Sequence, residues 1–201
     1  MKKLFTLTCL SALLIVPSAF AADTYVFDTA HSSIGFQIRH LFSNVPGKFD
    51  DFSGTIQFDE ANPDQSSVEV NIKTASIDTG VKMRDDDLRS PNFFDATKFP
   101  ETTFKSKSVK KTGDNTFDVT GDLTMHGVTK EVVLDVDGPS APIKDPWGNQ
   151  RAAASATTKI NRQDFGVKWN KTIDNGGVML GDEVSITIDV EMFQPAAKSG
   201  N

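Results

Sequence analysis

The chain is poor in the residues on which disulfide, thiol and metal chemistry depend. It has one cysteine, Cys9, and three histidines among its 201 residues. A single cysteine cannot form a disulfide within the chain, and His31, His40 and His126 show no close metal-ligand spacing. The Gly-x-Ser-x-Gly motif of many serine hydrolases is also absent. We therefore expect no catalytic centre, no metal site and no cofactor.

A surplus of basic residues is missing as well. The sequence has 27 acidic and 21 basic residues, a formal net charge of -6, and no clustered basic stripe. Nucleic acids and anionic membrane surfaces attract proteins mainly through arrays of lysine and arginine. The charge balance therefore argues against both as main partners.

Only one long apolar run occurs, from Leu4 to Val16, and two lysines precede it. Small residues follow it at Ala19 and Ala21, which is the pattern of a secretory signal peptide. We expect residues 1–21 to be removed by cleavage near the Ala21/Ala22 bond, and residues 22–201 to form a single exported domain, most simply periplasmic. A retained anchor helix is the alternative. No later run approaches the ~18 apolar residues of a transmembrane helix, so we expect no transmembrane segment.

Apolar and polar residues alternate through much of the remaining sequence. A period of two indicates strands with one buried face. The clearest segments are Ile34–His40, Gly54–Phe58, Val68–Lys73, Phe117–Met125, Val132–Val136 and Val184–Met192. Many short strands of this kind predict an antiparallel sheet that closes or folds over itself.

One further strand has an unusual inner face. In the stretch "RAAASATTKI", Arg151–Ile160, a period of two puts Ala152, Ala154 and Ala156 on the side where other strands carry Phe, Val or Ile. Methyl groups leave a groove about one side chain wide. The sequence leaves the occupant of that groove open.

The segment between Asp78 and Phe94 breaks the strand pattern. It is highly charged, with few apolar residues, and Pro91 marks a stop. We expect a short helix or helical loop across one end of the sheet. Its arginines, Arg84 and Arg89, either offer donors to oxygen atoms of a ligand or pair with the neighbouring aspartates on a solvated face.

Several motifs, in order along the chain, carry a resemblance to a known family. They are "HSSIGFQIRHL", "GKFDDFSGTIQFD", "RDDDLRSPNFFDATKFPETTFKS", "GDLTMHGVTKEVVLDV", "DPWGNQRAAA" and "INRQDFGV". Together they resemble the YceI-like polyisoprenoid-binding family. The resemblance implies an all-β fold, an extended antiparallel lipocalin-like barrel of about eight strands with a short helical insertion at one end. One departure is Asp87, where family members commonly have histidine.

The resemblance also implies a guest, a long apolar isoprenoid of the polyprenyl or isoprenoid-quinone type held along the barrel axis. Inward-facing side chains would contact it. The expected ligand-binding residues are Phe36, Ile38, His40, Ile56, Phe58, Val70, Ile72, Arg84, Leu88, Arg89, Phe94, Phe104, Val119, Ala152, Ala154, Ala156, Trp169, Ile186 and Ile188.

Two interpretations of the alanine row follow. A flexible hydrocarbon chain would fit the groove, or Phe36, Phe58 or Trp169 from facing strands fills it as ordinary packing of large against small side chains. His40 similarly either contacts a ligand at the barrel mouth or is satisfied by a backbone group.

These observations predict a periplasmic binding or carrier protein for a long apolar isoprenoid. Two alternatives remain, an esterase-like enzyme acting on a lipid and a ligand-free structural or stress-response barrel. The sequence leaves a monomer and a homodimer equally open.

Overall fold

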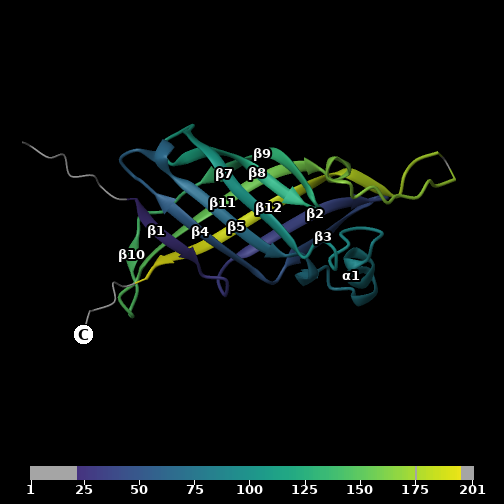
Figure 1. Ribbon diagram of the computed structural model, residues 1–201, viewed down its shortest axis with the longest axis horizontal. Coiled ribbons are helices and arrows are strands. Elements are labelled where there is room, and N and C mark those ends of the chain that lie inside the picture. Colours follow the sequence, from purple (N-terminus) through teal and green to yellow (C-terminus); the bar gives the residue numbers. More distant parts are fainter. Residues whose placement is uncertain (1–21, 175, 196–201) are drawn as a thin grey trace, which may run out of the picture.

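The computed structural model describes residues 22–174 and 176–195. The expected signal peptide, residues 1–21, lies outside the described residues, as does its cysteine. The described chain is an elongated β-barrel with one α-helix at one end (Figure 1). No helix in these ranges is long and apolar enough to span a membrane.

Strands make up most of the secondary structure. They are β1 (Asp23–Phe27), β2 (Ser33–His40), β3 (Ser43–Phe49), β4 (Phe52–Phe58), β5 (Ser67–Lys73), β6 (Ile77–Asp78), β7 (Glu101–Lys111), β8 (Thr116–Met125), β9 (Val128–Asp137), β10 (Ile143–Lys144), β11 (Gln150–Asn161) and β12 (Leu180–Gln194). The helices are α1 (Lys82–Arg89) and the 3-10 turns η1 (Pro63–Gln65), η2 (Thr74–Ser76) and η3 (Arg162–Phe165).

The sheet closes on itself through antiparallel pairs. β1 and β2 both pair with β12, at successive positions along its length. On its other edge, β1 pairs with β4, and β2 pairs with β3. The order then continues from β4 through β5, β7, β8, β9 and β11 back to β12. This is the expected closed barrel of eight antiparallel strands with one short helix.

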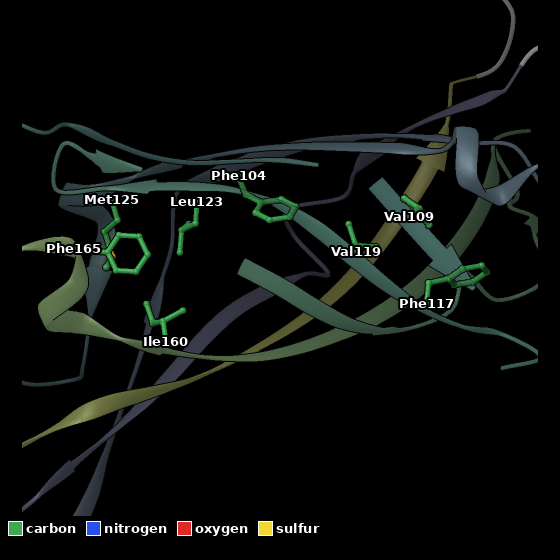
Figure 2. Close-up of a cluster of buried hydrophobic side chains, with 8 residues drawn as sticks. All are labelled: Phe104, Val109, Phe117, Val119, Leu123, Met125, Ile160 and Phe165. Atoms are coloured by element: carbon green, nitrogen blue, oxygen red, sulfur yellow. The ribbon is translucent and has the colours of Figure 1, made fainter. Parts of the chain in front are cut away.

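Alternation of inner and outer side chains explains where the core lies. In β8 every second residue from Phe117 to Met125 is buried, as the period of two predicted. Figure 2 shows a cluster of apolar side chains along this wall of the barrel. The cluster consists of Phe104, Val109, Phe117, Val119, Leu123, Met125, Ile160 and Phe165.

Three strands of five or more residues lacked a clear alternating pattern in the sequence, namely β1, β3 and β7. β3 contains Pro46 and Gly47, neither of which is typical of a strand interior. In β7 the pairing register with β8 shifts between Ser106 and Ser108, so the buried positions change from even to odd numbers. A bulge of this kind hides the period of two from sequence analysis.

The predicted helical segment is α1 with the turns that follow it. The Ser90 backbone amide donates to the Asp87 carbonyl at 3.0 Å, and the helix ends at Arg89, two residues before Pro91. β6, which precedes α1, pairs with Lys48 and Phe49 of β3, and the helix lies at the end of the barrel away from β10 (Figure 1).

Candidate ligand-binding cavity

The interior of the barrel holds a cavity of about 430 Å³. Side chains from β2, β4, β5, β7, β8, β9, β11 and β12 form its wall, and α1 closes one end. The lining is overwhelmingly apolar, and its volume lies in the range typical of small-molecule sites. An apolar chain can therefore be buried along the barrel axis.

The structure brings together nearly all the residues that the sequence predicted for this site. Those that line the cavity are Phe36, Ile38, His40, Ile56, Phe58, Val70, Ile72, Arg84, Leu88, Phe94, Phe104, Val119, Ala154, Ala156, Trp169, Ile186 and Ile188. Sequence analysis missed other lining residues, among them Phe27, Phe49 and Phe93. Phe27 and Phe49 lie in strands without a clear alternating pattern, and Phe93 lies in a loop.

The placement of two predicted residues needs correction. Arg89 does not line the cavity, because its Nε donates to the Ala75 carbonyl at 2.6 Å and its Nη2 donates to the Ile77 carbonyl at 2.5 Å. It fastens α1 to β6. Ala152 also lies outside the cavity and packs in a buried cluster with Tyr25, Val190 and Met192.

The alanine row therefore has two environments. At Ala152 large side chains fill the groove, as in ordinary core packing. Ala156 is 9% exposed yet belongs to none of the apolar clusters among the described residues, and like Ala154 it faces the cavity. Ala154 lines the cavity and also packs against the Ala152 cluster, whereas Ala156 lines the cavity outside the clusters of the described residues.

Glycines explain how a barrel rich in phenylalanine stays hollow. A Cβ added at Gly47 would lie 2.3 Å from the ring of Phe36, and one added at Gly121 would lie 2.5 Å from the ring of Phe104. Gly47 is the direct cross-strand partner of Phe36. Each ring thus lies flat against the wall, over a residue without a side chain, and leaves the barrel axis free.

Replacing Gly47 with alanine is expected to weaken the binding of an apolar ligand by on the order of tenfold. The new methyl group would force the Phe36 ring away from the wall and into the cavity. The control is Gly35→Ala, where the nearest atoms to an added Cβ are 3.6 and 3.7 Å away. Titration with a fluorescent lipid measures both variants, and equal affinities would contradict this account of the open lumen.

Polar groups gather at the α1 end of the cavity, where His40, Thr79, Arg84 and Asp87 line it. Arg84 donates from Nε to Thr79 Oγ1 at 2.7 Å and from Nη2 to the Thr79 carbonyl at 2.9 Å. Asp85 is buried and accepts from the Thr79 amide at 2.9 Å. Arg84 is thus held by Thr79 and not by the aspartates, and its side chain lines the α1 end of the cavity.

Aromatic rings close the same end. The rings of Phe36 and Phe49 lie 5.8 Å apart, and those of Phe49 and Phe94 lie 6.2 Å apart. The Phe93 ring lies 5.2 Å from Trp169, which joins the loop after α1 to the segment before β12. This end of the cavity is therefore lined by aromatic and polar side chains contributed by three distant parts of the sequence.

A second charged cluster surrounds Arg151. Its Nη1 donates to Asp28 Oδ2 at 2.7 Å and to Glu191 Oε1 at 2.5 Å, and its Nε donates to Asp145 Oδ2 at 2.9 Å. His31 Nδ1 lies 3.0 Å from Asp28 Oδ2. Asp28, His31 and Glu191 have the spacing of metal ligands, but the guanidinium group already neutralises the two carboxylates. Sequence analysis missed this cluster because its members are far apart in the chain.

The Arg151 cluster predicts a loss of stability in acid. Burial alone would raise the pKa of Asp145, but hydrogen bonds from Asn149, Arg151 and Trp147 outweigh it and lower the pKa from 3.8 to about 2. Because folding lowers the pKa of Asp145, its carboxylate contributes its full stabilisation of the fold above pH 3.8. This contribution is lost as the pH falls toward about 2. The stability difference between the wild type and Asp145→Asn should therefore shrink across this window. Urea unfolding at a series of pH values measures it, and a constant difference would contradict it.

Comparison with known proteins agrees with this architecture. The sequence model of the YceI-like domain matches residues 25–192. The chain belongs to the YceI-like family. The resemblance noted in the sequence is confirmed, and the match covers every strand that lines the cavity.

Individual YceI-like relatives agree over most of the chain. A UPF0312 protein of Pseudomonas savastanoi pv. phaseolicola is 45% identical over 170 residues, which are 83% of this chain and 88% of that protein. The crystal structure of the Campylobacter jejuni YceI protein is 35% identical with a TM-score of 0.67, covering 84% of this chain and 96% of the other. A polyisoprenoid-binding domain from Saccharophagus degradans shares the fold, with 18% identity, a TM-score of 0.62 and coverage of 85% and 98%.

Proposed function

We propose that the protein is a periplasmic carrier that holds a long apolar isoprenoid, of the polyprenyl or isoprenoid-quinone type, in the barrel lumen without a catalytic step. The observation that carries the proposal is the cavity of about 430 Å³ whose openness depends on small residues, Ala154, Ala156, Gly47 and Gly121. A barrel stabilised only by its own core would have larger side chains at these positions.

The chemistry of the lining favours a ligand recognised by its hydrocarbon tail. Each buried methylene contributes ~0.8 kcal/mol, so about ten carbons supply ~8 kcal/mol before ordering costs. A solvent-exposed ion pair at the mouth contributes only ~0 to 1 kcal/mol. Arg84 and His40 would then orient a head group, while the tail provides most of the affinity.

Two further observations support the class of ligand and the compartment. The Saccharophagus degradans domain with the same fold is a polyisoprenoid-binding domain. The apolar run with its preceding lysines and following alanines has the pattern of a signal peptide, which supports export to the periplasm.

Native mass spectrometry of protein purified from the periplasm without detergent tests the proposal. The expected result is a chain that begins at Ala22 or Asp23 and carries a bound apolar molecule identified as an isoprenoid on extraction. A chain that carries no such molecule and takes up no added polyprenyl lipid would indicate a ligand-free barrel. Turnover of a lipid ester, lost when one polar lining residue is replaced, would favour the esterase alternative.

A further inference from the structure

The cavity is closed at the end of the barrel away from α1, where β10 lies (Figure 1). There Ala152 directly follows a residue that pairs with β10, and Ala152 itself pairs with Met192 of β12. Met192 and Val190 line the cavity but are only 1% and 6% exposed. Tyr25 joins them and Ala152 in one buried cluster. Solvent therefore does not enter the cavity between these side chains.

Two phenylalanine rings meet across the inside of the barrel at this closed end. Phe58 ends β4 and packs against the cluster that contains Met192, whereas Phe117 lies in β8. β5 and β7 separate these two strands in the sheet, a distance of ~14 Å along the wall at ~4.8 Å between neighbours. The ring centroids are nevertheless only 6.4 Å apart, edge to face. The rings therefore reach toward each other through the interior. We call Phe58, Phe117 and Met192 the floor of the cavity.

The two ends of the cavity differ in chemistry. The floor consists of two phenylalanines and a methionine, all of which line the cavity. His40, Thr79, Arg84 and Asp87 line the α1 end instead. A polar head group buried against the floor would lose its hydrogen bonds with water and gain none from these three side chains. An amphipathic ligand therefore lies with its head group at the α1 end and the tip of its tail at the floor.

Ion pairs on the outer surface hold the strands around the floor in place. Side chains alternate along a strand, so Arg151 and Glu191, the neighbours of Ala152 and Met192, point away from the cavity. Arg151 Nη1 donates to Glu191 Oε1 at 2.5 Å and to Asp28 Oδ2 at 2.7 Å. These contacts fasten β11, β12 and the segment after β1 to one another. A floor held in this way gives the cavity a fixed depth.

We propose that the floor limits the length of the apolar tail that the cavity accepts, so that Phe58, Phe117 and Met192 select among ligands by tail length. This inference rests on the proposed function for the isoprenoid nature of the ligand, but the limit applies to any apolar chain. Each methylene that enters the cavity strengthens binding by about fourfold. A methylene that the floor excludes stays in water and adds no affinity. Affinity should therefore rise with tail length up to one length and then stop rising.

A series of n-alkyl chains of increasing length, all with the same dansyl head group, tests the limit on the delipidated protein. The dissociation constant of each probe is measured by fluorescence titration. For the wild type, affinity is expected to rise by about fourfold per methylene and then to level off at a break. Phe58→Ala removes a ring from the floor, so the break should move to a longer chain. A probe a few methylenes longer than the wild-type break should bind this variant at least about tenfold more tightly than the wild type.

Two further variants separate the floor from general effects on folding or volume. The matched control is Phe49→Ala, which removes the same ring from the cluster of Phe36 and Phe94 and should leave the break at its wild-type length. Ala154→Leu adds atoms where the cavity borders the Met192 cluster, so the break should move to a shorter chain. A folding defect cannot move the break in opposite directions in Phe58→Ala and Ala154→Leu.

Several results would overturn the length limit. These are a wild-type affinity that rises through the longest probe, a break that stays in place in both Phe58→Ala and Ala154→Leu, and an equal shift of the break in Phe49→Ala. Titration with polyprenols tests the carrier function separately. If the break moves as expected but polyprenols do not bind, the limit stands and the carrier function fails. If polyprenols bind and the break does not move, the limit fails and the carrier function stands. A protein that binds neither kind of chain contradicts both.

Discussion

Replacing Ala156 with phenylalanine is expected to weaken ligand binding by at least about a hundredfold while the barrel stays folded. Ala156 lines the cavity and belongs to no apolar cluster of the described residues. A larger side chain at this position would therefore occupy part of the cavity that the ligand would otherwise fill. Displacing about four carbons of a bound tail would remove ~3 kcal/mol of binding free energy.

Urea unfolding of the delipidated protein separates the two interpretations of the alanine row. If Ala156 faces an open lumen, the phenylalanine variant should be as stable as the wild type or slightly more stable. If neighbouring side chains pack against it, overfilling should cost ~1 to 3 kcal/mol. The control is Ala153→Phe, on the same strand with an exposed, outward side chain. A destabilised Ala156→Phe that binds ligand normally would refute the cavity at this strand.

Replacing Arg162 with methionine is expected to lower the free energy of unfolding by about 3 kcal/mol. Arg162 is only 3% exposed. Its guanidinium donates to the carbonyls of Val167 at 2.7 Å, Trp169 at 2.8 Å and Gly181 at 2.9 Å. Methionine would leave these carbonyls without their donor, and buried acceptors without partners are costly.

The same change should loosen the mouth, because Arg162 holds the backbone of Trp169 against β12. Urea unfolding measures the stability, and acrylamide quenching of tryptophan fluorescence, measured in a Trp147→Phe background, reports the exposure of Trp169. The control is Arg39→Met, an exposed arginine that donates to the Leu41 carbonyl and should change stability by less than about 0.5 kcal/mol. Equal stability of the two variants would contradict a structural role for Arg162.

The split among the predicted site residues has a geometric cause. Alternation correctly assigned Ala152, Ala154 and Ala156 to one face of β11. It could not show that Ala152 packs with Tyr25 and Met192 while Ala156 lines the cavity. Position along the barrel axis depends on the stagger between strands, and the period of two contains no information about stagger.

The placement of the two arginines in the helical segment also depends on tertiary contacts. Arg84 and Arg89 lie on either side of the same run of aspartates, and both were predicted at the site. Only Arg84 lines the cavity, because Arg89 donates to the carbonyls of Ala75 in η2 and Ile77 in β6. A helix of eight residues has no long apolar stripe to orient it, so its contacts with β6 decide which arginine faces the mouth.

The sequence by itself determined the all-β class, the helical segment at one end and membership of the YceI-like family, because alternation and local motifs are properties of neighbouring residues. Only the tertiary structure decided that Arg151 joins Asp28, Asp145 and Glu191, and that Gly47 receives the ring of Phe36. These features depend on contacts between paired strands and the loops that join them. Closure and strand register bring such residues together, and neither can be deduced from local spacing.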